Sequence, residues 1–343
     1  MAKISLIIPC YNVEKYIDRC LQSVISQTIG LESLEIICVD DASTDHTLIR
    51  LQIWEQSYPE FIMLIPCSHN GRQGTARNIG LSYASSDWVA FLDADDWLEP
   101  DFFEKLYSIT AKMDCDVVVS RMERDYSTEL TYLENRSSDK DDQYMVIDTD
   151  EKRNYFILFN SMSNSACARL IRKSLLLDHQ ITFPENLAYE DTYWGSLLHL
   201  YTNKVYFLEE KLYHYFVNNN STVLAGNLDY HTDLLTVQNM LWREWKERGF
   251  YPRYKDALEY DFLHSCYFSF LKILAFRYEN PPYSLYQLLK ELVEEKIGNC
   301  QDNPFLKEIQ LPELYQLLLQ SLSLSLTREE FQEFIRCIKS IGL

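Results

Sequence analysis

The chain has 343 residues, 47% of them hydrophobic, and a formal net charge of −19 at pH 7. This length favours two domains, or one domain with a large extension, and the apolar share is sufficient for a sizeable core. The acidic balance argues against a nucleic-acid partner and against attachment to an anionic membrane by bulk charge.

The cysteines and the N-terminus indicate in which cellular compartment the protein is expected. Nine cysteines are scattered along the chain without a CxxC pair, which predicts reduced, buried thiols rather than a disulfide framework. The N-terminus lacks signal-peptide architecture, and no apolar run is long enough to span a bilayer. We therefore expect a cytoplasmic protein, and peripheral association with the inner face of the membrane stays open.

Strands and helices alternate in the first 120 residues. Apolar runs bounded by turn signals predict buried strands, and segments with helical spacing of apolar residues lie between them. Such alternation indicates an α/β domain with a mostly parallel, Rossmann-like sheet and helices on both faces. The predicted strands are residues 4–9, 34–39, 63–65, 88–92 and 117–119, and a helix is expected over 75–84.

The middle of the chain has a less regular pattern. Residues 134–143 are polar and charged, which predicts an exposed loop. Residues 152–178 are expected to be helical with a break near 161–165. Beyond them we expect a helix over 193–201, strands over 205–208 and 213–216, and a turn-rich loop over 218–221.

The character of the chain changes after about residue 226, where amphipathic spacing predicts only helices. Thr327 and Glu330 have the spacing of a capping box before one of these helices. We therefore predict an α/β domain over 1–225 and a helical domain over 226–343, which could form a homo-oligomer.

Polar side chains follow the predicted strands at the points where the strands end. In open α/β sheets ligands bind beyond the carboxyl ends of the strands, so we expect these side chains to meet at one edge. They are Tyr11 and Asn12, Asp40 and Asp41, the loop at Asn70, and Asp93, Asp95 and Asp96.

Three carboxylates follow the fourth predicted strand within four positions, namely Asp93, Asp95 and Asp96. They repel one another and need compensation, most simply from a hard cation. Mg²⁺ or Mn²⁺ held together with a phosphorylated ligand would supply it. Capping of the following helix is the alternative interpretation.

Three other positions carry candidate chemistry, and each has a structural alternative. Asp40 could accept a hydrogen bond from a pyrimidine ring N–H or a ribose hydroxyl, or it could cap a helix. Arg77, which follows Gly71 and Gly74 in the segment 70–78, could pair with phosphate or ribose, or lie on the surface. Asp191, preceded by Glu190, could act as a general base or cap a helix.

Four segments of the chain, in the order in which the family has them, resemble the family 2 glycosyltransferases, which are inverting enzymes of the GT-A fold. A weaker resemblance continues through Phe183–Trp194 and Tyr213–Ser221. The four segments are Ile4–Thr28, Ile37–Thr47, Asn70–Gly80 and Trp88–Asp101.

The resemblance implies a UDP-sugar donor, Mn²⁺ or Mg²⁺, and a role for each matching residue. By position, Pro9, Tyr11 and Asp40 would frame uracil and ribose, and Arg77 would contact the nucleotide or phosphates. Asp93 would touch ribose or sugar, and Asp95 would ligate the metal. Asp191 would be the base. Asn12, Asn70 and Asp96 complete the donor-binding residues that we expect at this edge.

The resemblance implies that residues 1–225 are the catalytic domain, with a nucleotide and metal site in 1–120 and an acceptor and base region in 150–225, and that the helical domain over 226–343 could bind the acceptor. The activity that it implies is that of a hexosyl- or N-acetylhexosaminyltransferase. It would extend a cell-surface glycan, a teichoic-acid-like polymer or a glycoprotein chain, with a glycan, lipid-linked or glycoprotein acceptor. A nucleotidyltransferase of similar sheet architecture and a non-catalytic nucleotide-sugar-binding assembly subunit are the alternatives.

The chain departs from the family at one position. Relatives often carry an arginine after the aromatic run that begins at Tyr213, where it helps to close a loop over the diphosphate, whereas this chain has Phe216. Lys211, His214 or a helix N-terminus would then have to compensate.

Overall fold

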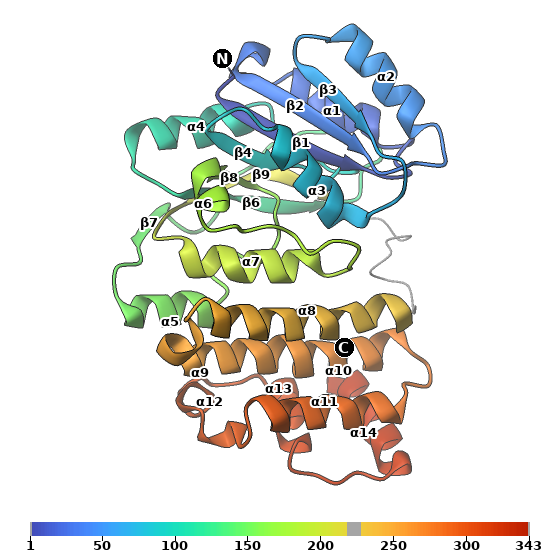
Figure 1. Ribbon diagram of the computed structural model, residues 1–343, viewed down its shortest axis with the longest axis vertical. Helices are drawn as coiled ribbons and strands as arrows, with labels where there is room; N and C mark the ends of the chain where they lie inside the picture. Colours follow the sequence, from blue (N-terminus) through green and yellow to red (C-terminus); the bar gives the residue numbers. More distant parts are fainter. Residues whose placement is uncertain (1, 218–227, 342–343) are drawn as a thin grey trace. The chain divides into compact units, whose positions relative to one another are not determined.

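The computed structural model describes residues 2–217 and 228–341 (Figure 1). The contacts divide the chain into two compact units, which we call the sheet unit and the helical unit. The sheet unit comprises residues 1–148 and 162–218, and the helical unit comprises 149–161 and 219–343. The domain boundary predicted at 225–226 and the loop predicted over 218–221 lie outside the described residues.

The sheet unit is built on a nine-stranded mixed sheet with the order β3-β2-β1-β4-β8-β6-β9-β5, in which β7 pairs with β9. Its strands are β1 Ile4–Cys10, β2 Leu34–Asp40, β3 Ile62–Pro66, β4 Trp88–Phe91, β5 Trp97–Leu98, β6 Val117–Asp125, β7 Gln143–Val146, β8 Arg169–Arg172 and β9 Lys204–Phe216.

The first four strands form a parallel half-sheet, as the alternating pattern predicts. β1 and β4 are buried along their whole length, because helices cover both faces of the sheet (Figure 1). The register pairs Cys10 with Asp40 and Asp40 with Pro66, so the carboxyl ends of three strands lie level. The polar residues that follow these strands are therefore delivered to one edge.

The remaining strands are mixed in direction, and one of them corrects a sequence prediction. Residues 169–172, expected to be helical, form β8, which runs antiparallel between β4 and β6. The helical prediction is wrong there because four residues are too few to show a period, while Leu170 and Ile171 are fully buried in the sheet. The two strands expected over 205–208 and 213–216 form one strand, β9.

The helices of the sheet unit connect and cover these strands. α3 packs on β1 and β2, and Gly80 makes the close approach possible, since a Cβ there would lie 2.4 Å from Cγ2 of Ile7. The helices are α1 Ile17–Ile25, α2 Thr47–Ser57, α3 Arg72–Tyr83, α4 Phe102–Lys112, α6 Lys173–Asp178 and α7 Glu190–Tyr201.

The helical unit confirms the helical pattern predicted for the C-terminal region. The capping box is present: the Glu330 N–H donates to Oγ1 of Thr327 at 3.3 Å, and the Thr327 N–H donates to Oε2 of Glu330 at 2.7 Å. Its helices are α5 Asp150–Leu158, α8 Leu228–Glu247, α9 Tyr251–Phe262, a π-helical turn Leu263–Phe268, α10 Ser269–Arg277, α11 Tyr283–Lys296, α12 Pro304–Glu308, α13 Glu313–Ser321 and α14 Arg328–Ile341.

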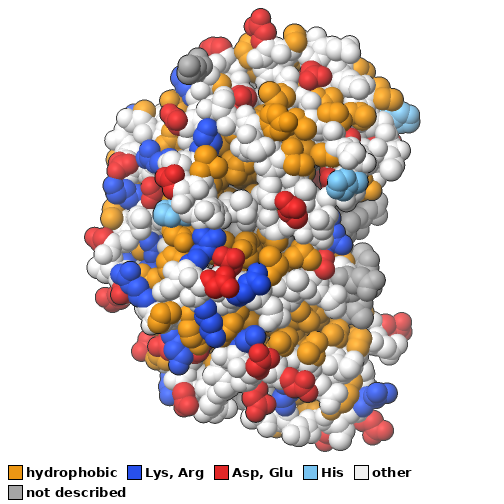
Figure 2. Space-filling view, in the orientation of Figure 1, with side chains coloured by type: hydrophobic (Ala, Val, Ile, Leu, Met, Phe, Trp, Pro, Cys, Tyr) orange, Lys and Arg blue, Asp and Glu red, His pale blue; other side chains and the backbone are white. Residues whose placement is uncertain are grey.

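The charge distribution on the surface and the apolarity of the helices are relevant to possible binding partners and to membranes. Acidic and basic side chains are interspersed over the face in Figure 2, with apolar side chains between them. Within residues 2–217 and 228–341, no helix combines the length and apolarity that crossing a membrane requires.

Candidate active site

The end of β1 supplies the first of the predicted donor-binding residues. Pro9 is buried within the strand, and the Tyr11 ring just beyond it is 46% exposed. Asn12 has a left-handed backbone with φ 53°, which asparagine tolerates better than most residues. Its side-chain oxygen accepts a hydrogen bond from the Thr44 N–H at 2.8 Å, so it ties the β1 end to the loop after β2.

The end of β2 leaves buried carboxylate oxygens without partners. Asp40 is 1% exposed; Oδ2 accepts from the Ser43 N–H at 3.3 Å, and no described residue bonds to Oδ1. Asp41 accepts from the Gly71 N–H at 2.8 Å, while its Oδ2 also lacks a partner among the described residues. Unsatisfied buried acceptors are costly, so both oxygens are suited to a ligand's N–H or O–H donors.

The loop before α3 is fixed to this edge. The side-chain amide of Asn70 donates to the Asp41 carbonyl at 3.2 Å, and Asn70 itself is exposed. At Gly74 a Cβ would lie 2.7 Å from the carbonyl oxygen of Pro184. Glycine is therefore required for α3 to approach the segment that leads into α7.

Arg77 on α3 joins two acidic segments that lie far apart in the sequence. Its guanidinium donates from Nη2 to Oδ1 of Asp93 and from Nη1 to Oε1 of Glu190, both at 2.8 Å. The side chain is only 4% exposed. Burial alone would lower the pKa of Arg77, but the charges of Asp93 and Glu190 raise it above its ordinary value. Arg77 therefore holds two carboxylates in place, and its predicted contact with the nucleotide or phosphates stays a prediction.

The crowded carboxylates after β4 have three different environments. Oδ1 of Asp93 accepts from Arg77 and, at 2.6 Å, from the side-chain amide of Gln73. Asp96 is 1% exposed, accepts from the Tyr213 hydroxyl at 2.5 Å and from the Phe216 N–H at 2.8 Å, and lies well before α4, which begins at Phe102. The Asp95 carboxylate accepts a hydrogen bond from its own backbone N–H, and no other described residue donates to it.

The pKa values follow this division. Burial, followed by the charge of Asp93, raises the pKa of Asp95 to about 6. Burial and the charges of Asp95 and Asp93 raise the pKa of Asp96 well above its usual range. The charge of Arg19 opposes the rise in the pKa of Asp95 only in part, so an added cation would further stabilise the ionised form of Asp95.

Asp191 lies in the first turn of α7, which follows Tyr189 in a left-handed conformation with φ 61°. Burial and the charge of Glu190 raise the pKa of Asp191 to about 6, against the opposing charge of Arg77. A carboxylate with this pKa is ionised at neutral pH and still basic enough to take a proton in a reaction. The structure therefore brings the proposed base, through Glu190 and Arg77, into one network with Asp93.

Sequence reasoning missed several residues that hold the acidic cluster. Tyr213 donates to Asp96, and its hydroxyl oxygen accepts from the Asp93 N–H at 3.3 Å. Arg19 on α1 is buried, donates to the Asp95 carbonyl at 2.6 Å, and lies 3.9 Å from the ring centre of Trp97. Only the apolar spacing of α1 and β9 pointed to these side chains, and it does not reveal polar partners.

The two side chains considered as substitutes at Phe216 are engaged elsewhere. The Lys211 ammonium pairs with Glu123 at 2.6 Å. The His214 imidazole is buried between Glu99 and Asp125. The expectation that either of them covers a diphosphate is therefore not met by these contacts.

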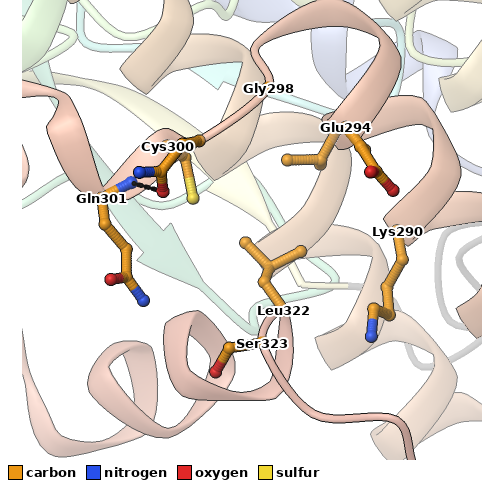
Figure 3. Close-up of a pocket in the computed structure, with 9 residues that line it drawn as sticks. Lys290, Glu294, Gly298, Cys300, Gln301, Leu322 and Ser323 are labelled. Carbon is orange, nitrogen blue, oxygen red and sulfur yellow. Dashed lines mark hydrogen bonds between the residues drawn. The ribbon is translucent and has the colours of Figure 1, made fainter.

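A separate cavity of about 390 Å³ opens in the helical unit (Figure 3). The turn Gly298–Gln301 and the segment Leu322–Ser323 line it together with side chains of α11. Its charged groups are Lys290 and Glu294, and the Lys290 ammonium donates to the Leu324 carbonyl. Its lining includes none of the predicted site residues.

The class of protein follows from this sheet edge and from comparison with known families. The model of the glycosyl transferase family 2 matches residues 5–179, and the chain belongs to that family. The fold is GT-A, as the resemblance of the four segments predicts.

Two similar proteins come from Bacillus species. The chain is 27% identical over 216 residues to the poly(ribitol-phosphate) beta-glucosyltransferase of Bacillus spizizenii, a match that covers 63% of this chain and 32% of that protein. It is 29% identical over 226 residues to the putative glycosyltransferase EpsH of Bacillus subtilis, covering 64% of this chain and 62% of EpsH. The chain thus spans less than two thirds of the length of these relatives.

Solved structures show the same fold. The crystal structure of Staphylococcus aureus TarS residues 1–349 has a TM-score of 0.69 at 20% identity, covering 98% of this chain and 90% of that one. The complex of the same protein with UDP-GlcNAc has a TM-score of 0.58 at 21% identity, covering 93% and 91%.

Proposed function

We propose that this chain transfers a sugar from a UDP-sugar to a hydroxyl of a glycan, polymer or glycoprotein acceptor, with inversion and dependence on a divalent metal. The observation that carries the proposal is the division among the acidic residues. Asp93 and Asp96 are held by protein donors, Asp95 is left for a cation, and Asp191 has the pKa of a base. The relatives include a poly(ribitol-phosphate) beta-glucosyltransferase and a poly(ribitol-phosphate) beta-N-acetylglucosaminyltransferase, which supports a cell-surface polymer as acceptor.

The residues present fit a hard divalent cation. Asp95 offers an oxygen ligand whose carboxylate form is disfavoured without a cation. In residues 2–217 and 228–341, no three His, Cys, Asp or Glu side chains are arranged to hold a metal by themselves. Mg²⁺ and Mn²⁺ commonly take one or two carboxylates and complete their shell with water and substrate phosphates. When bound at Asp95, such an ion would stabilise the charge of a departing diphosphate.

The chain's own residues would position the donor and move the proton. The unpartnered oxygens of Asp40 and Asp41 would accept from the uracil or ribose. Asp93, oriented by Arg77, would contact ribose or sugar. The acceptor oxygen forms a bond to the anomeric carbon while the bond from that carbon to the diphosphate breaks, UDP departs, and the hydroxyl proton passes to Asp191. A single displacement of this kind inverts the anomeric carbon.

The first experiment is a panel of UDP-sugars with MnCl₂, in which UDP release is measured with and without an acceptor and with EDTA as the metal control. The proposal expects slow hydrolysis of one donor that EDTA abolishes. Pyrophosphate release from a nucleoside triphosphate would instead identify a nucleotidyltransferase. UDP binding without turnover across the donor and acceptor panel would identify a binding subunit.

Asp95→Ala tests the metal assignment. We expect the affinity for UDP in the presence of Mn²⁺ to fall by about 10- to 100-fold, the range typical of losing a group that supports a metal site. Isothermal titration calorimetry with and without Mn²⁺ measures it. Asp178→Ala, at an exposed position at the end of α6, is the matched control and should bind as the unmodified chain does. Equal metal-dependent affinities of the two variants would refute the assignment.

A further inference from the structure

His214 on β9 is a buried histidine with an anion at each ring nitrogen. Nε2 lies 2.9 Å from Oε1 of Glu99, and Nδ1 lies 2.9 Å from Oδ2 of Asp125. The side chain is 1% exposed, and its ring stacks on Trp97 with the centres 4.6 Å apart. The ring is therefore fixed by contacts at both edges and on its face.

The geometry favours the imidazolium form, which donates from both ring nitrogens. A neutral imidazole donates from one nitrogen only and would direct the lone pair of the other at a carboxylate. Both carboxylates are also held by backbone amides: Glu99 Oε1 accepts from the Leu133 N–H at 2.7 Å, and Asp125 Oδ1 accepts from the Ser127 N–H at 2.8 Å. Burial tends to raise the pKa of Asp125, but the hydrogen bonds from Ser127 and His214 lower it below its usual value. The three side chains therefore form an anion–cation–anion triad, in which His214 and Glu99 are buried and Asp125 is 17% exposed.

The triad joins the strands that hold the donor-site aspartates. His214 pairs with Trp97 in the antiparallel contact of β5 with β9, while Asp125 is the last residue of β6. The residue before His214 is Tyr213, whose hydroxyl donates to Asp96 and accepts from the Asp93 N–H. Two residues after it, the Phe216 N–H donates to the other oxygen of Asp96.

The indole on which His214 stacks also leads to Asp95. The Arg19 guanidinium lies 3.9 Å from the ring centre of Trp97 and 4.6 Å from that of Phe216. The same guanidinium donates to the Asp95 carbonyl at 2.6 Å. A displaced His214 would therefore change the support of all three aspartates, although it touches none of them in the hydrogen bonds described.

We propose that His214, as an imidazolium between Glu99 and Asp125, is a positioning residue that sets Tyr213 and Asp96 for binding of the nucleotide diphosphate. The inference rests on the proposed function, because it assigns the aspartates to the donor. His214 thus acts from behind the site and not as a cover over the diphosphate.

The test compares UDP affinity in His214→Gln, Tyr213→Phe and the double variant, with Mn²⁺ present. His214→Gln removes the charge while keeping a polar side chain, and we expect UDP binding to weaken about tenfold, because breaking a buried charge pair leaves uncompensated charges. If His214 acts through Tyr213, the double variant should bind no more weakly than the weaker single variant. A merely structural role would make the two effects multiply.

Controls separate this inference from the proposed function and from loss of folding. His179→Gln makes the same change at an exposed position and should leave UDP affinity unchanged. Should His214→Gln not fold, Glu99→Gln keeps an acceptor oxygen for Nε2–H and removes one charge of the triad, and it takes the place of His214→Gln in the cycle. UDP affinity equal to that of the unmodified chain, or effects that multiply, would overturn the inference alone. Failure of the unmodified chain to bind UDP would overturn the proposed function.

Discussion

The sheet unit and the helical unit differ in how deeply they bury charged side chains. At the edge of the sheet the buried groups include Asp40, Asp96 and Arg77, all 3% exposed or less. The largest fully buried side chains of the helical unit are aromatic, namely Trp245, Tyr267, Tyr286, Phe156 and Phe262, and its most buried charged side chains, Arg153 and Glu259, are 5% exposed. Burying charge costs free energy that burying aromatic surface does not, so the sheet edge keeps an arrangement that stability alone would not favour. This difference supports the sheet edge as the proposed functional site.

Ion pairs show the same contrast within the sheet unit. The Arg77 side chain is 4% exposed and pairs with two carboxylates, whereas Arg50 and Asp18 form a pair on the surface with exposed fractions of 44% and 52%. The chemistry of the two pairs is alike. Because water screens the surface pair, only the buried one is expected to contribute strongly to structure.

The largest expected effect is that of Asp191→Asn. The amide cannot accept the acceptor's proton, so we expect the transfer rate at saturating donor to fall by about 10²- to 10⁴-fold, the range for losing a general base. UDP affinity should be preserved, because Asp95 and Asp40 are unchanged. Steady-state rates and titration calorimetry measure the two quantities, and Asp178→Asn is the control. Normal transfer by Asp191→Asn would show that the base lies elsewhere.

Arg77→Met breaks the buried network and is expected to lower the free energy of unfolding by about 3–5 kcal/mol, because Asp93 and Glu190 lose their shared cation. Urea denaturation followed by tryptophan fluorescence measures it. Arg50→Met removes the surface pair with Asp18 and should cost about 1 kcal/mol or less. Similar losses in the two variants would remove the distinction between buried and exposed pairs.

Lowering the pH should separate the two aspartates whose pKa values are raised. Burial and Glu190 raise the pKa of Asp191 to about 6, so its basic form is lost as the pH falls through that value. We expect the rate at saturating donor to fall about tenfold per unit below about pH 6. The pKa of Asp95 is also raised to about 6, so Asp95 becomes protonated over the same pH range. We expect this protonation to lower the UDP affinity unless Mn²⁺ is saturating. Rates and affinities measured between about pH 5 and pH 7 test both; a rate that stays constant over this interval contradicts the assignment of Asp191.

The sheet edge was predictable from the sequence because local signals act along single strands. Apolar runs located β1 to β4, and the rule on strand ends brought Asp40, Asn70 and Asp93 to one edge. The pairing of Arg77 with Glu190 was not predictable, because it joins positions that only the folded chain brings together. The strand Arg169–Arg172 escaped prediction for a related reason: its partners β4 and β6, not its own four residues, make it a strand.

The smallest expected effect tests the helical unit. Thr327 caps α14, and its hydroxyl accepts from the Glu330 N–H at 3.3 Å. Thr327→Ala leaves that donor without its partner and should reduce the stability of the first turn by about 1 kcal/mol, which corresponds to about fivefold faster hydrogen exchange of the α14 amides. Thr327→Ser keeps the hydroxyl and should exchange as the unmodified chain does. UDP affinity should not change in either variant, because the donor-binding residues proposed here all belong to the sheet unit. Weaker UDP binding in Thr327→Ala would show that the helical unit contributes to donor binding, and the contrast between the two units would then have to be redrawn.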